Sequence, residues 1–96
     1  MQPITIEHLL NEEQMDGKIR MFGHVTIQPH ETLEPHEHHG ETETYYILSG
    51  SGVYVDNGKE CPANPGDTFF CADGGSHGIS CTSEEPLVFM ALIILR

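Results

Sequence analysis

Residues 36–50 read HEHHGETETYYILSG and combine two strand-like segments with one tight bend. Successive side chains of a β-strand point to opposite faces, so His36 and His38 share one face. Gly40 permits the bend, because glycine adopts a positive φ without steric cost. Glu43 then follows on the next segment. The stretch therefore predicts neighbouring strands that bring imidazole and carboxylate groups together as a metal site.

Strand-like segments continue on both sides of this stretch, separated by turn residues at near-regular intervals. Asn57-Gly58 is the clearest hairpin signal, since both central positions of a type I′ turn need a positive φ. Strands are expected at residues 19–28, 34–38, 43–49, 52–56, 59–62, 68–71, 77–82 and 87–95, and only residues 6–14 indicate a short helix. The pattern predicts an all-β sandwich, jelly roll or small barrel, in which closure of the sheet manages its exposed edges.

Length and charge limit the organisation and the partners. Ninety-six residues suffice for a single domain over 1–96, with 1–18 as an N-terminal strand or arm and 19–96 as the barrel. Fifteen acidic residues against four basic ones give a net charge of -11, which repels phosphate backbones. The longest apolar run, residues 87–95, is too short to span a bilayer. We therefore expect neither nucleic acid nor a membrane as a partner.

The three cysteines, Cys61, Cys71 and Cys81, are odd in number and regularly spaced. The beginning of the sequence lacks the positive start and apolar run of a signal peptide, so we expect a cytoplasmic protein. Buried thiols in a reducing compartment are the simplest interpretation, and the sequence leaves their role open.

In the segment 87–95 both the odd-numbered and the even-numbered residues are apolar, so the segment predicts a strand that needs cover on both faces. One face would line the barrel. The other face, with the outward-facing Tyr46 and Leu48, would meet a second subunit and form a homodimer. Cover by the N-terminal segment of the same chain is the alternative.

Two segments of the chain carry a family resemblance. The spacing His36-x-His38-x(4)-Glu43-x(6)-Gly50 resembles the first motif of the cupin family, and residues 66–81, GDTFFCADGGSHGISC, are similar to the second. The resemblance spans residues 29–81 and implies a double-stranded β-helix, the jelly-roll barrel of small single-domain cupins. The departures from the motifs are His30 for the opening glycine of the first, and Ala72 for a proline and Cys81 for the final asparagine of the second.

By this resemblance the metal ligands are His36, His38, Glu43 and His77. Such a mixed nitrogen and oxygen set suits one divalent transition metal, namely Mn, Fe, Ni, Co, Cu or Zn, and does not suit Ca or Mg. Four ligands on an octahedral ion leave two open positions for substrate or dioxygen, whereas tetrahedral zinc would be closed. We favour the open arrangement, and the sequence does not identify the ion.

No catalytic residue is identified, but Tyr45 and Cys81 are candidates. Tyr45 shares the parity of Glu43, and it either donates a proton or simply packs in the pocket, which is the simpler interpretation. Cys81 shares the inward parity of His77 and would place an oxidisable thiol near the metal. The expected lining contains no Arg or Lys to hold an anionic substrate, with Arg20 as the exception to check.

The leading hypothesis is a metal-dependent enzyme that acts on a small organic molecule. The family resemblance implies an oxidoreductase such as a dioxygenase, a decarboxylase or an isomerase, without choosing among them. The alternative is a non-enzymatic module that binds a small ligand or a metal, as a sensor does. In a third interpretation the metal only stabilises a thin core.

Overall fold

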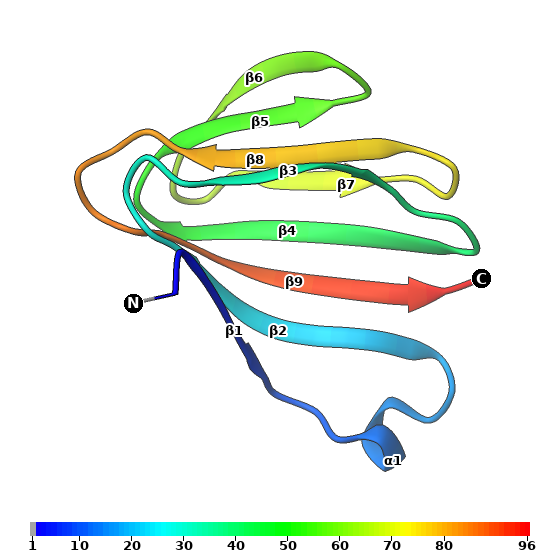
Figure 1. Cartoon of the computed structure of the whole chain (residues 1–96). Helices are drawn as coiled ribbons and strands as arrows, with labels where there is room; N and C mark the ends of the chain where they lie inside the picture. Colours follow the sequence, from blue (N-terminus) through cyan, green and yellow to red (C-terminus); the bar gives the residue numbers. More distant parts are fainter. Residues whose placement is uncertain (1) are drawn as a thin grey trace.

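Two antiparallel β-sheets face each other in the computed structural model, which describes residues 2–96 (Figure 1). One sheet has the strand order β1-β2-β9-β4-β7 and the other the order β3-β8-β5-β6. The elements are β1 (Ile4–His8), α1 (Glu12–Met15), β2 (Ile19–Ile27), β3 (Thr32–Glu37), β4 (Glu41–Ser49), β5 (Gly52–Asp56), β6 (Lys59–Ala63), β7 (Thr68–Cys71), β8 (Ser76–Cys81) and β9 (Leu87–Leu95). This nearly all-β arrangement confirms the predicted fold class.

The expected helix at residues 6–14 is wrong in its first half. Residues Ile4–His8 form β1, which pairs with the edge of β2 and sets Ile6 opposite Val25. The helix is limited to Glu12–Met15, after the N-cap Asn11. Pairing with a free strand edge therefore prevails over the weak local helix signal. Met1, the first residue of the predicted arm, lies outside the described residues.

Turn chemistry positions the strands as expected. Asn57 and Gly58 have φ values of 49° and 84°, which confirms the I′-type hairpin between β5 and β6. Gly50 has φ 77°, and a Cβ at this position would lie 2.3 Å from the carbonyl oxygen of Pro86. Glycine is required there because the end of β4 passes directly against the chain that leads into β9.

The core lies between the sheets and comes from inward residues of both. Its largest fully buried side chains include Tyr45, Tyr54, Ile79 and Phe89. Within residues 2–96 no strand pairing joins the two sheets, so the expected closure into one continuous barrel is wrong. The edges formed by β3 and by β1 remain unpaired with each other, and this leaves an opening between them.

The outer face of the five-stranded sheet exposes apolar side chains on its central strands β9 and β4. Tyr46 pairs with Met90 of β9, and both Tyr46 and Leu48 are exposed, as expected. Strand β2 separates β1 from β9, so the N-terminal strand extends the sheet and does not cover this face. The alternative of cover by the N-terminal segment is therefore wrong for β1. Within the described range, no helix has the length and apolar character needed to cross a membrane.

Candidate metal centre

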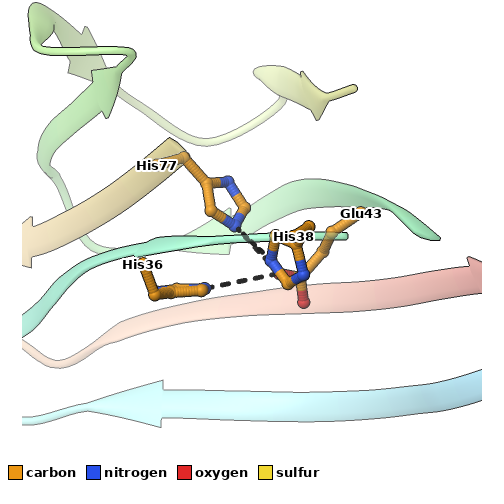
Figure 2. A group of neighbouring side chains, drawn as sticks. All are labelled: His36, His38, Glu43 and His77. Atoms are coloured by element: carbon orange, nitrogen blue, oxygen red, sulfur yellow. Dashed lines mark hydrogen bonds and ion pairs between the residues drawn. The ribbon is translucent and has the colours of Figure 1, made fainter. Parts of the chain in front are cut away.

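Three strands bring the four predicted ligands together. Pairing of β3 with β8 sets His36 opposite His77, and the amide of His38 donates to the carbonyl oxygen of Gly75 at 3.0 Å. Glu43 approaches from β4 in the other sheet. One donor atom from each residue lies within 4.8 Å of the others. Figure 2 shows the four side chains pointing toward one another. The group could therefore hold a metal ion.

The separations between the donor atoms are short. The Oε1 atom of Glu43 lies 2.8 Å from Nε2 of His38 and 2.9 Å from Nε2 of His77. These two nitrogens are 3.0 Å apart, and Nε2 of His36 lies 3.8 Å from the same oxygen. Bonds of about 2.1 Å to one ion would separate neighbouring ligand atoms by about 3.0 Å in an octahedron and about 3.4 Å in a tetrahedron. The three shortest separations are near the octahedral value, whereas the 3.8 Å distance from His36 exceeds both values.

Hydrogen bonds at the far nitrogen indicate the tautomers of two neutral rings. Nδ1 of His36 donates to the carbonyl oxygen of Glu34 at 2.9 Å, and Nδ1 of His38 donates to the carboxylate of Glu41. Because both partners only accept, a neutral ring carries its proton on Nδ1 and presents the lone pair of Nε2 to the cluster. These lone pairs converge on the Glu43 carboxylate, which is a third acceptor. Buried acceptors that face one another repel unless a proton or a cation lies among them, so this donor set fits a metal.

A buried carboxylate supports His38. Nε and Nη2 of Arg20 donate to the two oxygens of Glu41 at 2.6 and 2.7 Å. The hydrogen bond from Arg20, assisted by His38, lowers the pKa of the Glu41 carboxyl to about 2 against the opposing effect of burial. The same contact raises the pKa of Arg20. A carboxylate on the outer nitrogen of a metal-binding histidine holds the ring in place and makes it a stronger ligand.

Arg20 reaches this position through a β-bulge. Ile19 pairs with Ile94 and Met21 with Ile93, so Arg20 is an extra residue in β2. Simple alternation from the inward Met21 would turn Arg20 outward, and the bulge turns it back toward the cavity. The expected lining without Arg or Lys is therefore wrong. No signal in the sequence indicates this bulge.

Sequence reasoning also missed two supporting side chains, and here a signal exists. Glu41 lies two residues before Glu43 on the same strand, so the period of two places both on the inner face. Tyr54 lies in the confirmed β5–β6 hairpin, and its hydroxyl is 2.8 Å from Nδ1 of His77. Each of the three histidines thus has a partner at the nitrogen that faces away from the cluster.

A cavity of about 450 Å³ lies beside the cluster, between the edge formed by β1 and β2 and the start of β3. This volume falls in the range of small-molecule sites. Most of its lining is apolar. The lining residues that bear polar or charged groups are Arg20, Glu34, His36, His38, Glu43 and Tyr45. The metal candidates therefore face a space that a small ligand can enter.

The two catalytic candidates lie in different surroundings. Tyr45 lines the cavity and stacks on His77, with ring centroids 4.8 Å apart and an angle of 24° between the planes. Burial raises the pKa of the Tyr45 hydroxyl, which therefore stays protonated. Cys81 lies four residues after His77 on β8, and its thiol is 3.3 Å from the carbonyl oxygen of Glu85. The structure does not bring Cys81 to the cluster.

The cysteines form no disulfide within the described residues. Cys71 and Cys81 are buried and Cys61 is half-buried. Cys71 pairs with Glu43 across β4 and β7, and burial together with the nearby carboxylate raises the pKa of its thiol. A thiol with a raised pKa is a poor nucleophile, which agrees with the expectation of inert buried thiols.

Comparisons with known proteins agree with this geometry. The Cupin_2 family model, described as a cupin domain, matches residues 23–93. An "Oxalate-binding protein" of Thermotoga maritima is 44% identical over 92 residues, which are 96% of this chain and 76% of that protein. A crystal structure of a "predicted oxalate decarboxylase" from the same organism superposes with a TM-score of 0.94 at 43% identity, and the match covers 97% of this chain and 81% of the other. The cupin domain of Schizosaccharomyces pombe Cnp3 has a TM-score of 0.87 at 14% identity, covers 100% of this chain and 67% of its own, and supports the fold alone.

Proposed function

The chain belongs to the cupin family, and on that premise we propose that it binds one divalent transition metal and, through it, a small chelating organic acid. The proposed ligands are His36, His38, Glu43 and His77. A bound metal would act as a Lewis acid and hold the oxygen atoms of the acid at its open positions. The candidate ions remain Mn, Fe, Ni, Co, Cu and Zn, which share a preference for such donors.

One observation carries the metal proposal. Two imidazole lone pairs, set by the hydrogen bonds of His36 and His38, point at the buried carboxylate of Glu43. Glu43 and His77 are almost fully buried, so water does not separate these groups. Such an arrangement is costly without a cation and favourable with one.

The proposed ligand class rests on the cavity and on the relative. The relative is named as oxalate-binding, and a metal with open positions chelates two neighbouring oxygen atoms of such an acid. In this chain the proposed metal would lie at the polar end of the cavity, where His36, His38 and Glu43 contribute to the lining. Arg20, whose charge is paired with Glu41, also lines the cavity.

Catalysis is the second candidate, of the decarboxylase or oxidoreductase type. The observation that favours it is the position of Tyr45, which stacks on His77 and lines the cavity, where its hydroxyl could donate a hydrogen bond to a bound acid. Tyr45 is thus the proposed catalytic residue. The non-enzymatic alternative is that the same site binds its acid without turning it over.

Metal content and turnover test these proposals separately. Purified protein should contain one transition-metal ion per chain by mass spectrometry, and Glu43→Gln and His77→Ala should each lose it. His39→Ala is the matched control, because that side chain is 72% exposed and bonds to Glu37 outside the cluster. Full metal occupancy in both ligand variants would contradict the assignment. Release of formate and carbon dioxide from oxalate, or oxygen uptake with other acids, distinguishes an enzyme from a binding module.

We also propose that the chain forms a homodimer through the outer face of the five-stranded sheet. Thr44 pairs with Leu92 and Phe70, and Phe22 pairs with the other side of Leu92, so an apolar row crosses four strands. A second copy suits this face because the outward positions of β2, β4, β7 and β9 carry no Asp, Glu, Lys or Arg, so contact there adds no like-charge pair. The free thiols support the proposed cytoplasmic location.

A further inference from the structure

The cavity beside the proposed metal has two unlike ends. At one end lie the donor atoms of His36, His38 and Glu43, which Figure 2 shows converging. Apart from Arg20, Glu34 and Tyr45, the remainder of the lining is hydrocarbon from both sheets. These apolar side chains are Ile4, Ile6, Met21, Val25, Leu33, Pro35, Phe89, Ala91 and Ile93. A ligand whose head reaches the metal must place the rest of its atoms against this wall.

The positive side chain of the cavity lining is already paired before a ligand enters. Arg20 is the only Lys or Arg among the lining residues, and both oxygens of Glu41 already bind it. Glu34, also in the lining, adds a negative charge. The metal can neutralise one carboxylate of a ligand. A second carboxylate would find no free cationic side chain in this lining, and it would lose its hydration against apolar atoms.

We propose that the ligand is a monoanionic chelating acid with a hydrocarbon substituent, such as a 2-oxo or 2-hydroxy acid with an apolar side chain. The head, a carboxylate with a neighbouring oxygen, binds the metal, and the substituent occupies the cavity between Ile6, Val25 and Leu33. This inference rests on the proposed function and narrows its ligand class.

Oxalate lacks the substituent that this cavity would bury. It carries two carboxylates joined directly, so it could chelate the ion but would leave the apolar wall without contacts. Each methylene group buried against such a wall contributes roughly a fourfold gain in affinity. A longer acid is therefore expected to bind more tightly than oxalate until the cavity of about 450 Å³ is filled.

Calorimetry on protein loaded with one equivalent of Co²⁺ tests this inference, and the visible spectrum of cobalt reports binding independently. The series is oxalate, pyruvate, 2-oxobutanoate, 2-oxopentanoate and 2-oxohexanoate. We expect affinity to rise roughly fourfold per added methylene over the first members. 2-Oxoglutarate resembles 2-oxohexanoate in length but ends in a second carboxylate, and we expect it to bind at least about tenfold more weakly.

A wall substitution locates the substituent. Ile6 is 45% exposed at the rim of the cavity, so Ile6→Thr removes apolar surface without opening the core. It should weaken binding of 2-oxohexanoate more than binding of oxalate. Thr5→Ser, on the other face of the same strand, is the matched control and should change neither. If the ratio of the 2-oxohexanoate affinity to the oxalate affinity is the same in Ile6→Thr as in the parent chain, this placement of the substituent is wrong.

The outcomes separate this inference from the function on which it rests. If oxalate binds more tightly than every 2-oxo acid, or if affinity does not depend on chain length, the inference is wrong and the proposed function stands. If the Co²⁺-loaded protein binds none of these acids while it retains its metal, the proposed ligand function is wrong, and the inference fails with it.

Discussion

The two faces of the five-stranded sheet differ sharply although alternate residues of the same strands form them. On the inner face of β4, Glu41 and Glu43 are buried and each contacts a histidine. On the outer face of the same strand, Tyr46 and Leu48 are exposed. The described outward positions of β2, β4, β7 and β9 include no Asp, Glu, Lys or Arg. On β2, β4, β7 and β9, charge is thus confined to the inner face, where it is paired and can serve chemistry; on the edge strand β1, Glu7 lies opposite His24 on the outer face.

This contrast explains how so small a chain can hold a polar cluster in its interior. The inner face carries the cost of burying charged groups, which a metal would offset. The outer face carries unburied hydrocarbon, which a second copy would cover. The proposed metal and dimer therefore stabilise opposite faces of one sheet, and they can be disrupted one at a time.

Removal of the metal should have the largest effect. A metal present at a thousand times its dissociation constant stabilises the folded state by about 4 kcal/mol, which corresponds to roughly 20 °C in the melting temperature of a domain of this size. We expect a chelator to lower the melting temperature by this order in a thermal scan. The dimer should persist in sedimentation measurements, since the outer face is unchanged. A melting temperature that does not respond to chelation would contradict a stabilising role for the metal.

Tyr46→Glu should disrupt the other face. It places a charge at the centre of the apolar surface in each copy, and we expect the dimer to dissociate at least about a hundredfold more readily by analytical ultracentrifugation. Metal content should stay at one ion per chain. Leu9→Glu, an equally charged change at an exposed residue outside the sheet, is the control. A variant that remains dimeric would place the interface elsewhere.

Glu41→Ala tests the support of His38 from within the inner face. Loss of the carboxylate frees the ring, and we expect metal affinity to fall by about 10-fold to 100-fold in a chelator competition. Glu37→Ala should leave the affinity unchanged, because Glu37 is exposed and bonds to His39. Equal affinities for Glu41→Ala and the parent chain would show that the salt bridge with Arg20 has a structural role alone.

Lowering the pH should reduce the unfolding stability of the metal-free protein by protonating the Glu41 carboxylate. The pKa of Glu41 is about 2 in the folded state, below its ordinary value near 4.5. The stabilisation of the folded state by the ionised Glu41 carboxylate is therefore complete above pH 4.5 and is lost as the pH falls toward 2. We expect urea unfolding to show the parent more stable than Glu41→Gln by about 2 kcal/mol at pH 7, with the difference shrinking below pH 4.5. A difference that stays constant down to pH 2 would exclude this cause.

Much of this architecture could be predicted from local rules. Alternation of side chains and turn residues such as Asn57-Gly58 predicted the strands from β2 to β9, and parity predicted that Tyr45 faces inward and Tyr46 outward. The grouping of His36, His38, Glu43 and His77 came from the family resemblance, and the register of β3 against β8 explains it physically.

The remainder depended on features that local rules do not encode. The pairing of β1 with β2 joins segments whose individual preferences are weak. The bulge at Arg20 adds one residue to an otherwise regular strand, and nothing in its composition marks the position. His30 stands where the first motif has glycine and adopts φ 67°, so the backbone keeps the glycine-like conformation although the side chain does not favour it.

The bulge in β2 also has a consequence for how such a cavity can acquire its positive charge. Ile19 and Met21 pair with adjacent residues of β9. Removal of Arg20 would therefore leave a continuous ladder in which all the remaining side chains keep their original faces. Gain or loss of a single codon there could add or withdraw the guanidinium while the surrounding scaffold stays the same. Ligand preference could then diversify among descendants of one ancestor without any redesign of the fold.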